Sequence, residues 1–182
     1  MMNKVCAFTG HRPSKLPWRY DEMDSRCVAL KTVLTEQITA LIEAGVTQFL
    51  SGMAEGTDIF CSEIVLALRE KNPAIKLHCI LPCTAQAEKW SVSSQELYRS
   101  ILGRADSVVY VSREYHEKCM TDRNRFLVEH AAVLLVVYNG VRRSGTGATV
   151  NYARKMDREI IVIDPITQHI THGEFAPLPA RS

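Results

Sequence analysis

Short apolar runs that recur between longer amphipathic stretches are the feature that most constrains how this chain can fold. There are six such runs, each four to seven residues long. A short, mostly apolar run is typical of a strand that is buried on both faces, as in a parallel sheet covered by helices. The predicted strands are residues 4–8, 48–51, 76–81, 107–111, 132–138 and 159–163.

The amphipathic stretches between the runs have the length and spacing of helices. Strands that alternate with helices predict an α/β fold, in which a mostly parallel sheet of about six strands lies between two layers of helices. Gly45 and Pro73 mark two of the helix ends. The predicted helices are residues 22–43, 56–71, 93–103, 122–130 and 149–156.

The size of the chain indicates one domain. It has 182 residues, 46% of them hydrophobic, which is enough for one core and too little for two ordinary domains. We therefore predict a single domain over residues 1–182. Two stretches lack a helix or strand pattern and are predicted to be flexible, namely the loop 12–21 and the tail 167–182.

Composition argues against several classes of function. The net charge is +2, far from the excess expected of a chain held to nucleic acid by charge alone, so nucleic acid is not the expected partner. No segment approaches about 18 uninterrupted apolar residues and no basic leader precedes the first strand, so we expect no membrane contact and a cytoplasmic location. The six cysteines lack the paired spacings of zinc sites and disulfide frameworks, which predicts buried thiols and no metal site.

The turn after the first strand carries Gly10, His11 and Arg12. Ligands of an open parallel sheet bind beyond the C-terminal ends of its strands, so every loop that follows a strand is a candidate. A guanidinium matches phosphate oxygens with two parallel hydrogen bonds, and a glycine lets a ligand approach the backbone. A turn in which His11 and Arg12 only tie down the loop explains the same residues equally well.

The loop after the second strand, residues 51–58, leads directly into a helix. Free backbone N–H groups and the positive end of a helix dipole favour an anion there. Glu55 would repel a phosphate, so we assign it ribose hydroxyls or, if the protein is an enzyme, an acid–base role. A plain turn capped by Thr57 or Asp58 is the alternative. The candidate ligand contacts are Ser51, Gly52, Met53, Glu55, Gly56 and Thr57.

A second glycine-rich loop follows the fifth strand and opens the last predicted helix. Arg142 and Arg143 precede it and would offset the charge of an anionic ligand. One glycine pair usually marks a capped turn, but two such loops on one sheet indicate a phosphate site more strongly. The candidate contacts from this loop are Gly145, Thr146, Gly147 and Thr149.

A polar helix start at residues 121–125 adds two further candidates. Arg123 and Asn124 could contact a ribose or the edge of a base. A solvated first turn with an aspartate cap explains them nearly as well.

Together, the segments 9–13, 51–58, 122–125 and 144–149 resemble the SLOG superfamily of Rossmann-like proteins and, within it, the bacterial YpsA-like family. The resemblance covers nearly the whole chain. It implies a Rossmann-like three-layer fold with a nucleotide-derived small molecule, such as an ADP-ribose-like compound or a nucleoside phosphate, bound across the strand ends. No cofactor is required in this interpretation, which favours a sensor or binding domain.

Two related families imply other functions. Lonely-guy type phosphoribohydrolases end their glycine-rich loop with a catalytic glutamate, where this chain has Asn151. An amide cannot act as a carboxylate base, so Glu55 is the remaining catalytic candidate for a hydrolase of an N-glycosidic or phosphate bond. The DNA-processing protein A family has a loop similar to residues 51–58 and implies single-stranded DNA binding, which the small net charge disfavours. By analogy with other doubly wound sheets, the helix at 22–43 is the candidate surface for a homo-oligomer.

Overall fold

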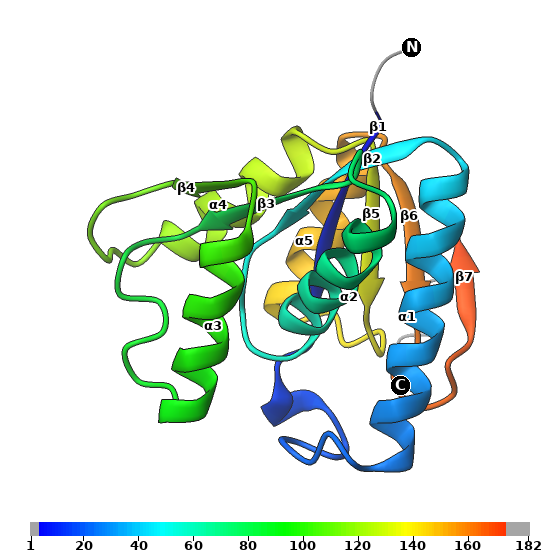
Figure 1. The fold of residues 1–182 in the computed structure, drawn as a ribbon, viewed down its shortest axis with the longest axis horizontal. Coiled ribbons are helices and arrows are strands. Elements are labelled where there is room, and N and C mark those ends of the chain that lie inside the picture. The colour runs from blue at the N-terminus through cyan, green and yellow to red at the C-terminus, as the bar shows by residue number, and fades with distance from the viewer. Residues whose placement is uncertain (1–3, 174–182) are drawn as a thin grey trace, which may run out of the picture.

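The sheet at the centre of the molecule has seven strands in the order β4-β3-β2-β1-β5-β6-β7. The computed structural model describes residues 4–173. Strands β1 to β6 are parallel, and β7 runs antiparallel to β6 (Figure 1). The predicted α/β class with a mostly parallel sheet is therefore confirmed. The strands are β1 (Lys4–Gly10), β2 (Val46–Ser51), β3 (Lys76–Leu81), β4 (Ser107–Tyr110), β5 (Val133–Val137), β6 (Glu159–Ile163) and β7 (Ile170–His172).

Helices cover both faces of the sheet and make a three-layer, Rossmann-like arrangement (Figure 1). Three helices pack on one face and bury the larger core, and two pack on the other face over the smaller core. The first group is α1 (Ser25–Glu43), α2 (Thr57–Lys71) and α3 (Val92–Arg104), and the second is α4 (Cys119–Glu129) and α5 (Gly145–Lys155).

The central strands are unbroken apolar runs in the sequence because their side chains alternate between two buried cores. Successive side chains of a strand point to opposite faces of the sheet. In β1, Cys6 and Phe8 enter the larger core, whereas Ala7 enters the smaller one. Phe8 stacks on Phe49 of β2 with ring centroids 5.7 Å apart. Both faces are thus filled, which leaves no polar alternation in the sequence.

The chain order reverses between β1 and β5. From β1 the chain adds β2, β3 and β4 on one side, then returns to place β5 and β6 on the other. The loops that leave β1 and β5 therefore diverge toward opposite faces of the sheet at its carboxyl edge, the lower side of Figure 1. Such a switch point is where open α/β sheets bind their ligands.

Three helices begin three or four residues from their predicted start, whereas α2 and α3 begin within one residue of it. Helix α1 begins at Ser25 rather than at 22, since the Asp24 side chain accepts a hydrogen bond from the Arg26 N–H. Helix α4 begins at Cys119, three residues before the predicted start. Helix α5 begins at Gly145 rather than at 149, since Ser144 caps it. The glycine-rich segment after β5 is consequently the first turn of a helix rather than a loop.

The loop 12–21 does not match the flexible segment expected from its sequence. It contains a 3₁₀ turn, Pro13–Lys15, and it buries Leu16 and Trp18, which are 3% and 4% exposed. Burial of these two side chains in the larger core fixes the loop at the carboxyl edge of β1. The prediction of a flexible loop is therefore wrong here.

Residues 170–172 of the predicted flexible tail form the edge strand β7, and the flexibility of the tail stays a prediction. Asp164 starts the turn into this strand by accepting the N–H groups of Ile166 and Thr167. A three-residue strand is too short to show periodicity, which is why the sequence gives no sign of it. Residues 174–182 of the predicted tail lie outside the described residues.

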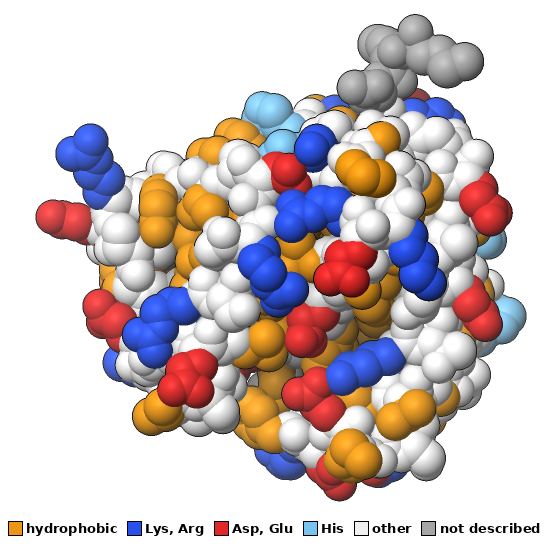
Figure 2. Space-filling view, viewed as in Figure 1, with side chains coloured by type: hydrophobic (Ala, Val, Ile, Leu, Met, Phe, Trp, Pro, Cys, Tyr) orange, Lys and Arg blue, Asp and Glu red, His pale blue; other side chains and the backbone are white. Residues whose placement is uncertain are grey.

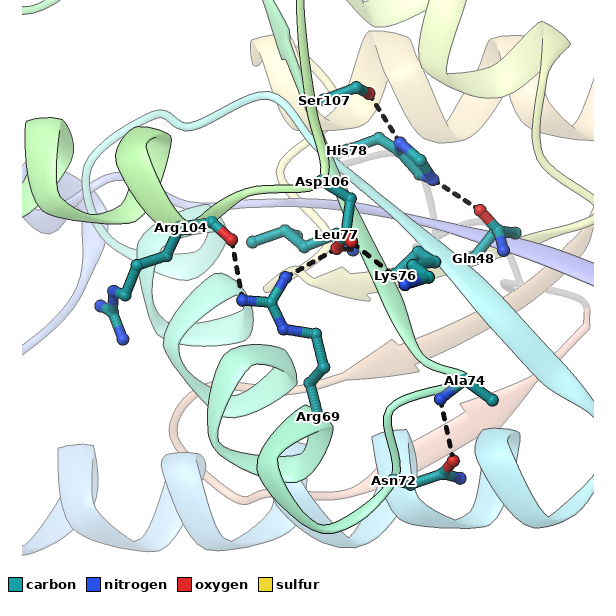
Figure 3. A network of polar contacts seen from close by, with 10 residues as sticks. All are labelled: Gln48, Arg69, Asn72, Ala74, Lys76, Leu77, His78, Arg104, Asp106 and Ser107. Atoms are coloured by element: carbon teal, nitrogen blue, oxygen red, sulfur yellow. Dashed lines mark hydrogen bonds and ion pairs between the residues drawn. The ribbon is translucent and has the colours of Figure 1, made fainter.

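A polar network at the amino edge of β3 and β4 joins several elements (Figure 3). Asp106 accepts from Arg69 at 2.7 Å and from the Leu77 N–H at 2.9 Å, and lies 3.3 Å from the Lys76 ammonium. Next to it, His78 bridges Ser107 and Gln48. This edge is opposite the carboxyl ends of the strands, so we assign the network to stability.

Over the described residues, no helix is both long enough and apolar enough to cross a lipid bilayer. All six cysteines are buried free thiols, as the sequence indicates. On the face covered by α1, α2 and α3, positive and negative side chains are interspersed (Figure 2).

Candidate functional site

A cavity of about 350 Å³ opens at the carboxyl ends of β1 and β5, at the switch point of the sheet. We call it the main groove. Its volume is at the lower end of the range for small-molecule sites. The turn after β1, the start of α2, the start of α4 and the loop after β5 contribute its walls. The lining residues are Thr9, Gly10, His11, Arg12, Ser14, Lys15, Ala54, Asp58, Met120, Arg123, Asn124, Asn139, Val141, Arg143, Ser144, Gly145 and Thr146.

The charge of the main groove is positive. Arg12, Lys15 and Arg143 are exposed at its rim, and none of them forms an ion pair with another residue in the range 4–173. Arg123 adds a fourth cation, while Asp58 is the one carboxylate among the described lining residues. An arrangement of this kind favours an anionic group from solution over any partner within the chain.

Arg123 is buried, with 3% of its surface exposed, and it holds the loop after β2. One guanidinium nitrogen donates to the Gly52 carbonyl, and Nε donates to Asn124 Oδ1 at 2.8 Å. A Cβ at position 52 would collide with this guanidinium, so a larger residue there would require the Arg123 side chain to move. Gly52 therefore makes room for an arginine rather than for a ligand.

Asp58 lies in the wall of the groove, 5% exposed, and accepts the Ala54 N–H at 3.1 Å. Burial raises the pKa of its carboxyl, while Arg123, the Ala54 bond and Arg12 act in the opposite direction. Burial also lowers the pKa of Arg123, and the nearby Asp58 opposes that change. The two groups thus compensate for part of the cost of their burial.

His11 connects the turn after β1 to the loop after β5. Its Nε2 lies 2.9 Å from Asn139 Oδ1 and 3.1 Å from the Asn139 backbone nitrogen, and its ring packs on Tyr138. Burial lowers the pKa of the imidazole, against a smaller rise from Asn139, so the ring is neutral near pH 7. His11 lines the groove and also fixes the distance between two of its walls.

The loop 51–56 satisfies much of its own hydrogen bonding instead of presenting N–H groups to a ligand. Ser51 Oγ accepts the Met53 N–H at 3.2 Å, and Thr57 Oγ1 donates to the His11 carbonyl at 3.1 Å. Met53 is fully buried in the larger core. None of these three residues, nor Gly52, Glu55 or Gly56, lines the main groove.

Glu55 lines a different and smaller cavity, of about 50 Å³, which Pro13 also lines. Its carboxylate accepts a hydrogen bond from the Tyr20 hydroxyl at 3.2 Å. Phe60 and Trp90 also line this cavity. The predicted catalytic candidate is therefore separated from the residues with which it was expected to act.

Of the four contacts predicted from the second glycine-rich loop, only two line the main groove. Gly145 and Thr146 line the main groove. Gly147 does not, because its N–H donates to Ser144 Oγ at 3.0 Å and a Cβ there would lie 2.6 Å from the Arg142 carbonyl. Thr149 donates to the Gly145 carbonyl at 2.9 Å and lines a neighbouring cavity.

Of the sequence candidates, the groove therefore brings together Gly10, His11, Arg12, Arg123, Asn124, Gly145 and Thr146. Sequence reasoning missed Lys15 and Asn139 and treated Asp58 as a cap. Lys15 lies in the loop expected to be flexible, so no pattern placed it. Asp58 is one helical turn from loop residue 54, a spacing that could have indicated a carboxylate turned back toward the loop.

Residues 6–168 match the model of the YspA SLOG family. Related proteins include a UPF0398 protein from Bacillus pumilus, 35% identical over 75% of this chain and 74% of that protein. Another, from Bacillus licheniformis, is 30% identical over 84% of each chain. The SPbeta prophage-derived protein YoqJ of Bacillus subtilis is 30% identical over 67% of this chain and 81% of its own length.

Among solved structures, the chain is similar to DNA processing protein A from Helicobacter pylori, a protein with a single-stranded DNA binding mode. The TM-score is 0.58 at 17% identity, over 89% of this chain and 66% of that chain. At this identity the similarity concerns the fold, and this chain spans about two thirds of the solved one.

Proposed function

Because this chain belongs to the YspA SLOG family, we propose that its main groove binds a phosphate-bearing nucleotide or nucleotide-derived small molecule. The observation that carries the proposal is a set of cations at the groove, Arg12, Lys15 and Arg143, that form no ion pair with any described residue and lie beside the first turn of α5. Cations and the amino end of a helix favour the same kind of group, a phosphate.

The proposal gives each wall a role. Arg12, Lys15 and Arg143 bind phosphate oxygens, together with the Thr146 hydroxyl at the helix start. The polar side chains of Asn124 and Asn139 also line the groove, and their amide groups suit a ribose or a base.

Binding is favoured over hydrolysis by the position of the carboxylates. Glu55 lies in the smaller cavity, and Asn151 stands where the related phosphoribohydrolases have a glutamate. Asp58 lines the groove, but it is engaged by the Ala54 N–H and lies near Arg123. A sensor or carrier of a nucleotide derivative needs none of these groups to transfer a proton.

The test is a thermal-shift panel of ADP-ribose, nucleoside mono- and diphosphates, and their unphosphorylated nucleosides. We expect stabilisation by at least one phosphorylated compound and not by its nucleoside. Arg12→Ala should remove most of the shift, whereas Arg99→Ala, an exposed arginine on α3 outside the groove, should retain it. No shift with any compound, or the same shift in both variants, contradicts the proposal.

A second candidate ligand is single-stranded nucleic acid. It is supported by the similarity in fold to DNA processing protein A, which binds single-stranded DNA. The small net charge alone is therefore not a sufficient reason to set nucleic acid aside. Short single strands belong in the same panel, and an affinity that falls steeply with salt would favour them.

A further inference from the structure

A second cavity, of about 250 Å³, lies between α4 and α5 and adjoins the main groove. The two cavities share Asn124 of α4 and Gly145 of α5, which line both. A Cβ at Gly145 would meet nothing within 4 Å, so there is open space beside this residue, where the two cavities meet. A ligand in the main groove can therefore continue past the start of α5 into the second cavity.

The chemistry of the second cavity is also that of an anion site. Arg125 and Lys155 line it, one from each helix, and no carboxylate is among its described lining residues. Both side chains are exposed and neither forms an ion pair within residues 4–173. The remaining polar wall consists of neutral groups such as Thr121, Asn151 and Tyr152.

Tyr152 positions one of the two cations. The Arg125 guanidinium lies 5.5 Å from the centroid of the Tyr152 ring, and the Tyr152 hydroxyl donates to Glu129 at 2.6 Å. This contact orients the guanidinium without neutralising it, since the ring carries no net charge. Arg125 thus keeps its hydrogen-bond donors for a ligand.

The spacing along α5 sets the size of a ligand that reaches both cavities. Gly145 and Tyr152 are two helical turns apart, a rise of about 10 Å, and the side chain of Lys155 points back toward that turn. A nucleoside monophosphate has one anionic group and fills one cavity. Successive phosphates of a stacked strand advance by about 3.4 Å, so a strand that spans this distance takes about three phosphate steps, as in a 5′-phosphorylated tetranucleotide.

We infer that the physiological ligand carries at least two phosphate groups on linked nucleosides, with one phosphate at Arg12, Lys15 and Arg143 and a further one at Arg125 and Lys155. This rests on the proposed function, because it extends the same groove. The shared chemistry is a short phosphodiester-linked oligonucleotide, either free or as the end of a longer single strand.

The experiment is isothermal titration of each of the four nucleoside 5′-monophosphates and of the matching 5′-phosphorylated trinucleotides and tetranucleotides. We expect the better of the linked compounds to bind at least about tenfold tighter than its monophosphate, because it adds a second charged contact. Arg125→Ala/Lys155→Ala should abolish this gain and leave the affinity for the monophosphate unchanged. The control Lys71→Ala/Arg99→Ala removes two exposed charges elsewhere and should keep the gain.

Equal affinity for monophosphate and linked nucleotides in the wild type overturns the inference and leaves the proposed function standing. So does an equal loss for both kinds of ligand in Arg125→Ala/Lys155→Ala. Binding of none of these compounds overturns both. A 5′-phosphorylated ten-nucleotide strand decides the source. Affinity equal to that of the tetranucleotide indicates a strand end, and weaker binding indicates a free oligonucleotide.

Discussion

Asp58 and Arg123 are buried groups of opposite charge in the wall of the main groove. Removal of Arg123 takes away the first of the groups that favour the ionised Asp58 and leaves the Ala54 N–H and the more distant Arg12. We expect Arg123→Met to lower the free energy of unfolding by about 3 kcal/mol at pH 7.5, a loss that includes the hydrogen bond to the Gly52 carbonyl. Urea denaturation measures it.

The same variant has a pH dependence whose sign follows from Asp58. Burial raises the pKa of this carboxyl, and without Arg123 its ionised form costs still more. The ionised Asp58 carboxylate destabilises the folded state, and this destabilisation disappears as pH falls and the carboxyl is protonated. The difference between wild type and Arg123→Met should therefore be smaller at pH 5.0 than at pH 7.5. The same difference in stability at both pH values would show that Arg123 does not stabilise the ionised Asp58 carboxylate.

His11 gives a second prediction at the residue scale. Burial lowers its pKa in the folded protein, so the unfolded chain binds the proton more tightly. The stabilising contribution of the neutral ring is complete above the unfolded pKa, about 6.5, and is lost as pH falls through the folded pKa. The melting temperature of the wild type should fall more steeply from pH 7.5 to 5.0 than that of His11→Gln. Parallel curves would contradict this assignment.

Single residues also show what the sequence could and could not predict about the site. Arg12 and Asn124 were identified because they lie next to strand or helix ends, and the groove contains both. Gly52 and Met53 were taken for ligand contacts, but glycine-rich loops look alike whether the space beside the glycine holds a phosphate or the chain's own arginine. Only tertiary packing distinguishes the two cases.

At the scale of elements, Ser144 determines where α5 begins. Its hydroxyl accepts the Gly147 N–H and thereby sets the helix start beside the groove. Ser144→Ala should lower stability by about 1 kcal/mol, the usual value of an N-cap. Ser100→Ala, at an exposed position within α3, should be neutral or slightly stabilising. Thermal unfolding of both variants checks the pair, and equal effects would argue against the cap.

Strand β4 shows that an apolar run predicts a strand but does not predict its burial. It was predicted as a buried strand, yet Val108, Val109 and Tyr110 are 36%, 38% and 46% exposed. The strand lies at the edge of the sheet, and an apolar run does not reveal which strand takes that position. The short strand β7 at the other edge was not predicted, because three residues are too few to show the two-residue periodicity of a strand.

At the scale of the whole molecule, the sheet and its two cores were predictable, since alternating elements and buried runs leave few other arrangements. The placement of Glu55 was not, because the direction in which a loop side chain points depends on the 3₁₀ turn and on buried Trp18. A single domain and a homo-oligomer through α1 remain predictions.

The six buried thiols make global unfolding measurable by chemistry. Burial raises the pKa of Cys6 and Cys61, and that of Cys79 to about 12, which keeps these thiols protonated. We expect a thiol reagent to modify the native protein far more slowly than the urea-unfolded chain. Rapid modification of all six thiols in native buffer would contradict the packing described.

The most direct test of the central claim is to titrate the tightest phosphorylated ligand of the panel into Arg143→Ala and Glu55→Gln by calorimetry. The two residues line different cavities. We predict that Arg143→Ala weakens binding by about tenfold or more, the usual value of one charge-assisted contact, whereas Glu55→Gln leaves the affinity unchanged. Loss of binding in Glu55→Gln, with Arg143→Ala unaffected, would place the ligand in the smaller cavity and contradict the account.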